Sequence, residues 1–166
     1  MNKESFWKIM LETNKESGGE SEAQQELIAQ KLSEISPDEI IIFDNIFQEF
    51  MNKAYDWKLW AAAYIVNGGC SDDCFMDFRG WLIAQGEEIY NNALTDPDGL
   101  SALDNLVEDM EWEGYGYLAM TVYEKKTGHE MPMNQETNHS SDPSGEQWDE
   151  DELESLLPKL SQKHGW

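Results

Sequence analysis

The sequence has few cationic side chains: 11 lysine and arginine residues stand against 34 aspartate and glutamate residues, for a formal net charge of −23. Proteins that bind DNA, RNA or anionic membrane surfaces use clustered Lys and Arg, so this imbalance excludes direct nucleic-acid binding and membrane attachment. It favours a cationic partner, which is a basic protein surface, a metal ion or a positively charged small molecule. The alternative is that the carboxylates form ordinary solvated faces that only keep the protein soluble.

The chain also lacks long apolar runs and has little cysteine. No stretch approaches the roughly 18 apolar residues that a membrane-spanning helix needs, and residues 1–9 lack the pattern of a signal peptide. Cys70 and Cys74 are the only cysteines, whereas secreted proteins of this size usually carry more. These absences predict a cytoplasmic protein without a membrane segment.

Aromatic residues, by contrast, are plentiful, with seven Trp, six Phe and six Tyr in 166 residues. Such side chains bury a large area each, which is enough for one packed domain. Apolar residues recur at helical spacing, and no run alternates with the period of two typical of strands. The sequence therefore predicts an all-α fold, a compact single-domain bundle of about seven to nine helices.

Cap and turn residues predict where the helices begin and end. The clearest start is Ser36-Pro37-Asp38-Glu39, with a serine N-cap, a proline in the first turn and a glutamate that closes a capping box. The helix from it extends to about residue 55. Further helices are predicted over residues 6–17, 21–32, 57–65, 72–85, 87–94, 100–110 and 115–126, and after the capping pair Asp149 and Glu152, with a kink or end at Pro158.

Three parts follow along the chain. Residues 1–128 form a helical core domain, and residues 147–166 form a C-terminal helix that packs on this core. Between them, residues 129–146 mix Pro, Ser, Asn and Gly without periodicity. This composition predicts an irregular loop or linker.

The most distinctive stretch runs from Trp57 to Gly86. An aromatic helix is followed there by Asn-Gly-Gly-Cys-Ser-Asp-Asp at residues 67–73, and then by Phe-Arg-Gly-Trp-Leu at residues 78–82. This pattern resembles the signature of a bacterial family, domain of unknown function 4240, and the likeness extends to Phe6-Trp7 and to residues 145–149. The chain departs from the family pattern at Cys74, where glycine is more usual. The resemblance implies no activity.

Arg79 is the only arginine in the chain, and it lies beside an apolar stripe of the predicted helix. Asp72, two turns earlier, is its nearest helical carboxylate. One interpretation is a buried Asp72–Arg79 pair that fixes the loop after Asn67 against the helix. The other is a ligand-binding pocket formed by Asn67, Asp72 and Arg79, in which the arginine binds an anionic group at the helix N-terminus.

Two other kinds of site are less favoured. Cys70 at a helix N-terminus would suit a nucleophile, but no histidine base lies near it in sequence, so a buried inert thiol is the preferred interpretation. Asp72, Asp73 and Asp77 offer oxygen ligands for Mg²⁺ or Ca²⁺, but their spacing follows no known metal loop. We therefore expect no metal site and no cofactor, with Asp73 and Asp77 on a solvated face.

Three functions remain open, in the following order. The first is a protein-binding or regulatory module with a basic partner, following the logic of immunity proteins that block nucleases. Its candidate contact is Trp112 among the carboxylates Glu108, Asp109, Glu111 and Glu113. The alternative, slightly preferred, is that Trp112 is a core residue and the carboxylates only solubilise a helix end. The second is a small enzyme or ligand-binding domain at Asn67, Asp72 and Arg79. The third is a nucleic-acid mimic.

Overall fold

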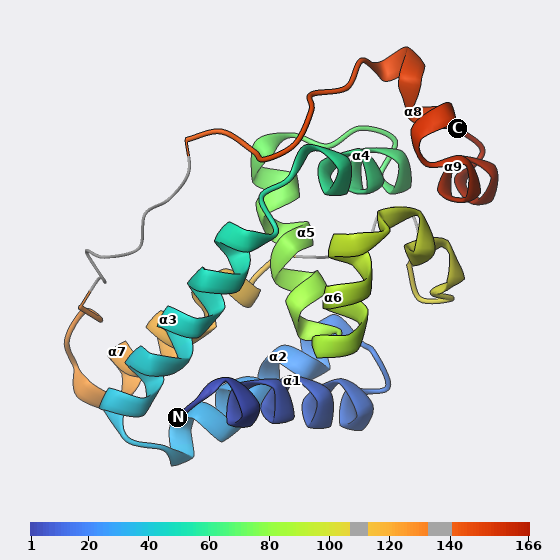
Figure 1. The fold of residues 1–166 in the computed structure, drawn as a ribbon. Coiled ribbons are helices and arrows are strands. Elements are labelled where there is room, and N and C mark those ends of the chain that lie inside the picture. Colours follow the sequence, from blue (N-terminus) through green and yellow to red (C-terminus); the bar gives the residue numbers. More distant parts are fainter. Residues whose placement is uncertain (107–112, 133–140) are drawn as a thin grey trace.

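The computed structural model describes residues 1–106, 113–132 and 141–166. These residues form nine α-helices and three short 3-10 helices, with no strand, which confirms the all-α prediction (Figure 1). The α-helices are α1 (Lys3–Ser17), α2 (Ser21–Glu34), α3 (Pro37–Lys53), α4 (Trp57–Val66), α5 (Asp72–Ala84), α6 (Glu87–Thr95), α7 (Leu118–Thr127), α8 (Leu153–Leu156) and α9 (Pro158–His164). The 3-10 helices are η1 (Pro97–Ala102), η2 (Tyr115–Tyr117) and η3 (Glu150–Glu152).

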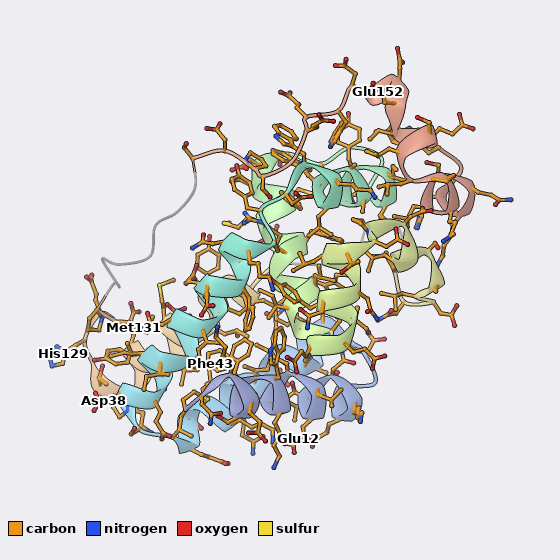
Figure 2. The ribbon with its side chains drawn as sticks, in the orientation of Figure 1. Glu12, Asp38, Phe43, His129, Met131 and Glu152 are labelled. Atoms are coloured by element: carbon orange, nitrogen blue, oxygen red, sulfur yellow. A yellow bond between two sulfur atoms is a disulfide. The ribbon has the colours of Figure 1, made fainter. Side chains whose placement is uncertain are left out.

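Helix α5 is the centre of the fold. It contacts α1, α3, α4 and α6, and its Phe75, Phe78 and Trp81 are fully buried. Helices α1, α2, α3 and α7 gather at one end of the molecule, and α4, α8 and α9 at the other, with the two termini at opposite ends (Figure 1). Side chains such as Phe43 point into the core, whereas Glu12, Asp38 and Glu152 point outward (Figure 2).

The helix boundaries follow the predicted caps. Ser36 and Glu39 form the expected capping box at the start of α3, with Pro37 in the first turn. Gly18 and Gly128 end α1 and α7 in left-handed conformations, with φ of 66° and 73°. Such φ angles are strained for residues with a Cβ, so glycine suits both positions.

One predicted helix is wrong over part of its length. Residues 100–102 belong to η1, but Leu103–Leu106 are not helical, and residues 107–110 lie outside the described part. Apolar spacing indicates a helix here, yet Leu106 is buried and Leu103 half-buried in an irregular segment. Pro158 ends one helix, as predicted, but it also starts α9 at the first turn, where its missing N–H costs nothing.

The C-terminal helices are fixed to the rest of the protein by a buried carboxylate. Asp98 of η1, only 6% exposed, accepts hydrogen bonds from the backbone N–H groups of Lys159 and Leu160 at 2.9–3.2 Å. It thus satisfies the free amides at the start of α9, as an N-cap would, from a distant part of the chain. In the part of the chain described, no helix is long and apolar enough to cross a membrane.

Candidate functional site

Arg79 is buried inside the protein and bonded to its backbone. The side chain is 8% exposed, and its Nη1 donates to the Met51 carbonyl oxygen at 2.8 Å, near the end of α3. Its Nε donates to the Phe75 carbonyl oxygen at 3.4 Å. The guanidinium lies 4.5 Å from the Tyr55 ring centroid and 5.0 Å from that of Phe75. Burial lowers the pKa of Arg79, and the nearby Tyr55 and Asp72 oppose this shift. Arg79 therefore joins α5 to the C-terminal end of α3.

Asp72 and Arg79 form no ion pair, and each of them contacts Tyr55. The Tyr55 hydroxyl donates to Asp72 Oδ1 at 3.1 Å, while the ring of the same tyrosine faces the guanidinium. Burial and the Asp72 carboxylate raise the pKa of Tyr55. Among the described residues, the ion pairs within 4.0 Å involve lysines and the N-terminus, not Arg79. The predicted direct Asp72–Arg79 pair is wrong, because Asp72 lies exposed on the first turn and Tyr55 fills the space between the two.

Asn67 contacts neither Asp72 nor Arg79 through a hydrogen bond, and bonds the turn between α4 and α5 instead. It ends α4, and its Nδ2 donates to the Gly69 carbonyl oxygen at 3.2 Å and to Cys74 Sγ at 3.8 Å. Cys74 is bonded to Cys70 in a disulfide, with Cα atoms 5.4 Å apart. The predicted free thiol at Cys70 is therefore wrong, although its burial is as expected. The turn through the Ser71 N-cap brings the two Cα atoms within the range that a disulfide spans.

These three predicted ligand residues have partners within the fold. Arg79 donates inward to carbonyl groups, Asp72 accepts from Tyr55 at the surface, and Asn67 bonds the turn that precedes α5. Their contacts support the architectural interpretation, in which they fix α4, α5 and the end of α3 to one another. The ligand-binding role of Asn67, Asp72 and Arg79 stays a prediction.

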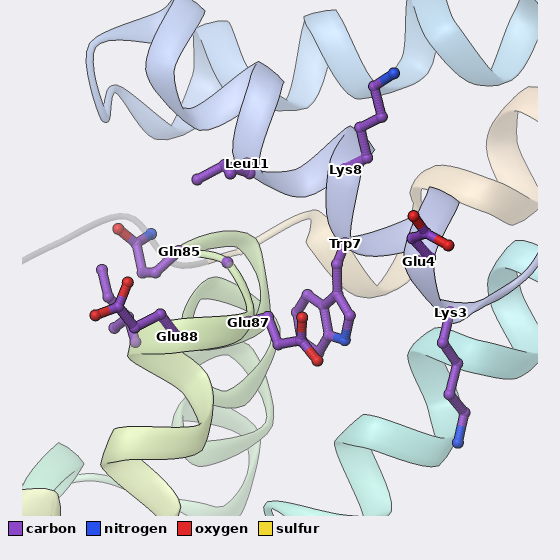
Figure 3. Close-up of a pocket in the computed structure, with 10 residues that line it drawn as sticks. Lys3, Glu4, Trp7, Lys8, Leu11, Gln85, Glu87 and Glu88 are labelled. Carbon is purple, nitrogen blue, oxygen red and sulfur yellow. The ribbon is translucent and has the colours of Figure 1, made fainter.

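A broad groove of about 680 Å³ lies between α1 and the start of α6 (Figure 3). Its apolar lining comes from Trp7, Leu11 and Ile89. Figure 3 shows Trp7 beside Glu87, with the side chains of Lys3 and Lys8 pointing away from the hollow. The charged groups around it therefore do not converge on one point, as they do in a polar ligand site.

A second hollow, of about 480 Å³, is acidic. We call it the acidic hollow; it is lined by Asp73, Met76, Asp77, Glu113, Gly114 and Tyr117. Burial first, and then the charges of Glu113 and Asp73, raise the pKa of Asp77. Tyr117 is 54% exposed, the most exposed large hydrophobic side chain in the described residues. The hollow thus combines a half-buried carboxylate, whose charged form is disfavoured, and two further carboxylates with an accessible aromatic ring.

The sequence indicated only part of this hollow. Of the predicted acidic contact, Trp112 and the carboxylates of residues 108, 109 and 111 lie outside the described residues, whereas Glu113 is described and exposed. Asp73 and Asp77 were predicted to lie on one solvated face, and Asp77 is in fact half-buried. No local pattern connects them to Tyr117, because that contact depends on how η2 packs on α5.

Cation chemistry at the hollow is limited by its geometry. Within residues 1–106, 113–132 and 141–166, no group of three or more His, Cys, Asp or Glu side chains could hold a metal ion. The charges of Glu113 and Asp73 are close enough to Asp77 to help raise its pKa, but the three carboxylates do not converge on one point as metal ligands do. A cationic side chain, which spreads its contacts over several ångströms, fits such an arrangement better than a bare ion.

Comparison with known proteins gives a family. The sequence profile described as a protein of unknown function (DUF4240) matches residues 1–125, about three quarters of the 166 residues. The chain belongs to the DUF4240 family. No curated protein and no solved structure matches it.

The DUF4240 match includes both groups of residues described above. The contacts of Arg79 and the disulfide lie within residues 1–125, as does the whole acidic hollow up to Tyr117. The C-terminal helices α8 and α9 lie beyond the matched residues. The candidate sites are thus placed on the DUF4240 part of the chain.

Proposed function

We propose that this protein is a binding or regulatory module that holds a basic segment of a partner protein at the acidic hollow. The observation that carries the proposal is the arrangement of the acidic hollow, in which the half-buried Asp77 lies with Asp73 and Glu113 beside the exposed ring of Tyr117; burial first, and then the charges of Glu113 and Asp73, raise the pKa of Asp77. Carboxylates held near one another in this way are destabilised by mutual repulsion. A lysine or arginine side chain in the hollow would relieve that repulsion.

The energy available fits a modest but specific contact. Two opposite charges about 4 Å apart near a protein surface attract with about 4 kcal/mol before desolvation and ordering are subtracted. Exposed ion pairs retain about 0.2–1 kcal/mol each. A cation over the Tyr117 ring adds about 0.5–1 kcal/mol at an exposed site. Three carboxylates and one ring can thus anchor one basic side chain, with neighbouring contacts supplying the remaining affinity.

The net charge of −23 supports the same proposal at longer range. A strongly acidic surface steers a basic protein toward it and raises the association rate, and this effect weakens as salt increases. It also opposes binding to nucleic acid. We include a cytoplasmic location in the proposal, supported by the low number of cysteines, two in 166 residues. The disulfide that these two form does not add to this support, because disulfides are rare in the cytosol.

Isosteric substitutions test the site. The double variant Asp77→Asn/Glu113→Gln removes two charges from the hollow and keeps its shape. Its matched control, Glu16→Gln/Glu34→Gln, removes two charges from exposed positions on α1 and α2. Binding of a fluorescent oligolysine peptide is measured by anisotropy at low and at half-molar salt.

The expected result is a several-fold weaker affinity for Asp77→Asn/Glu113→Gln than for the control, at equal net charge and low salt. High salt should remove most of the difference, because exposed charges are screened beyond about 3 Å at 1 M salt and about 8 Å at physiological ionic strength. Equal affinities of the two variants would show that the peptide senses net charge alone, and the hollow would lose its role.

A further inference from the structure

The cysteine pair at the start of α5 offers chemistry that a binding surface does not use. We propose that Cys70 and Cys74 form a reversible thiol–disulfide site, a bond that is reduced and re-formed in the folded protein. The inference rests on the geometry of residues 60–75 and is independent of the acidic hollow. It agrees with the cytoplasmic location proposed above, where disulfides are transient or redox-sensing as a rule.

The fold does not depend on this bond. The two cysteines are four residues apart, so the bond closes a very short loop and constrains the unfolded chain little. The same segment is held by three hydrogen bonds that involve no sulfur atom. Trp60 Nε1 donates to the Cys70 carbonyl oxygen at 2.9 Å, Cys74 N to Ser71 Oγ at 3.2 Å, and Phe75 N to the Ser71 carbonyl oxygen at 2.9 Å. These bonds remain when the sulfurs separate.

The two sulfur atoms are not equivalent toward a reagent. Cys70 is 9% exposed, whereas Cys74 is partly exposed on the first turn of the helix. An external thiolate therefore attacks Cys74, forms a mixed disulfide there and displaces Cys70 as a thiolate, which takes a proton from solvent. The Asn67 amide, 3.8 Å from Cys74 Sγ, stabilises negative charge on that sulfur when it leaves in the next step.

A dithiol completes the reaction with balanced electrons. Its second thiolate attacks the external sulfur of the mixed disulfide, displaces the Cys74 thiolate and forms the reagent's own disulfide. The cysteine pair gains two electrons and two protons in total, and the dithiol loses the same number. Re-oxidation by a low-molecular-weight disulfide follows the reverse path.

Charge selects among reagents at this site. Asp72 and Asp73, both exposed, precede Cys74 in the same helical turn. They repel an anionic thiolate and attract a reagent that carries a positive group, an effect that salt screens. We expect the rate constant of reduction, calculated per thiolate, to be several-fold larger for cysteamine than for 2-mercaptoethanesulfonate. In half-molar salt the two rate constants should become nearly equal.

The first test uses the native protein without denaturant. Dithiothreitol should reduce the bond completely, as shown by alkylation and intact mass, and oxidised dithiothreitol or cystamine should restore it. Circular dichroism of the reduced form should match that of the oxidised form. Retention of the bond until denaturant is added, loss of helical signal on reduction, or failure of the bond to form in the native protein would each overturn the proposal.

Single-cysteine variants identify the attacked sulfur. In Cys70→Ser the remaining Cys74 should form a mixed disulfide with cystamine several-fold faster than the remaining Cys70 does in Cys74→Ser. The serine at either position keeps the backbone hydrogen bonds described above, and circular dichroism checks that both variants fold. Equal rates in the two variants, or equal rates with the cationic and anionic thiols, would contradict attack at Cys74.

Discussion

Replacing Arg79 by alanine tests how the centre of the fold is held together. The substitution removes the donor to the Met51 carbonyl oxygen at 2.8 Å and the weaker one to Phe75 at 3.4 Å. It also removes the cation that lies against the rings of Tyr55 and Phe75. Helix α5 then loses its polar connection to the end of α3.

The expected loss is about 2–4 kcal/mol of unfolding free energy. A hydrogen bond from a charged donor contributes about 1.5–3 kcal/mol, and a cation over an aromatic ring about 0.5–2 kcal/mol. The gain that opposes these losses is desolvation, because burial of the guanidinium is unfavourable, as the lowered pKa of Arg79 indicates. The Met51 carbonyl group left without this partner keeps the net effect destabilising.

Asp72 should contribute far less. Asp72→Asn keeps an oxygen that accepts from the Tyr55 hydroxyl, and it loses only a carboxylate at the helix N-terminus, worth about 0.3–1 kcal/mol. The two sites are joined through Tyr55 and not directly. Because both residues contact Tyr55, the double variant should depart from additivity by only about 0.5–1 kcal/mol, the lower end of the range for coupled residues.

Urea unfolding of the wild type, both single variants and the double variant measures these quantities, with the m-value checked for constancy. A coupling energy above about 3 kcal/mol between positions 72 and 79 would refute the reasoning, because it exceeds the value for residues that only share a partner and matches a direct buried pair. A loss below about 1 kcal/mol for Arg79→Ala would show that its backbone contacts carry little stability.

Three further predictions concern other parts of the chain. Asp98→Ala should cost about 1–3 kcal/mol in urea unfolding, because buried amides at the start of α9 lose their acceptor, and Asp98→Asn should cost less. Folding raises the pKa of Asp77, so protonated Asp77 stabilises the folded protein below the ordinary pKa of about 3.9, and this stabilisation is lost as the pH rises through the pKa of the folded state. Asp77→Asn should therefore raise the melting temperature at pH 7 and not below about pH 4. An equal rise at the two pH values would contradict the raised pKa. Limited proteolysis should cut first within residues 129–146, the predicted linker, and a first cut within residues 43–51 would show that the predicted three-part division of the chain is wrong.

The helix boundaries that could be predicted are set by interactions between residues close in sequence. Ser36 and Glu39 satisfy free amides within one turn, and Gly18 adopts a left-handed φ that ends α1. Both effects act between residues close in sequence, so the sequence contains all the information they need. The error at Leu103–Leu106 arose because leucines at helical spacing, here the half-buried Leu103 and the buried Leu106, occur equally in an irregular segment that packs on the core.

The candidate site was less predictable because it depends on packing. Burial of the only arginine was expected from its apolar neighbours, but its acceptors are carbonyl groups, which every residue carries and no sequence pattern marks. Tyr55 enters between Asp72 and Arg79 from the segment after α3, and Tyr117 reaches α5 from 40 residues further along the chain. The disulfide was missed because the interpretation of Cys70 rested on the lack of a histidine base near it, whereas the bond depends on the turn through the Ser71 N-cap that brings Cys70 to Cys74.

The protonation of Asp77 gives the most direct test of the proposed function. Carboxyl carbon NMR of the folded protein follows the titration of Asp77 alone and in the presence of saturating oligolysine peptide. Binding in the acidic hollow should shift the midpoint of Asp77 to lower pH, because a nearby cation favours the carboxylate and offsets the charges of Glu113 and Asp73. A midpoint that does not move while the peptide is bound would contradict the account, because the basic segment would then lie elsewhere on the surface.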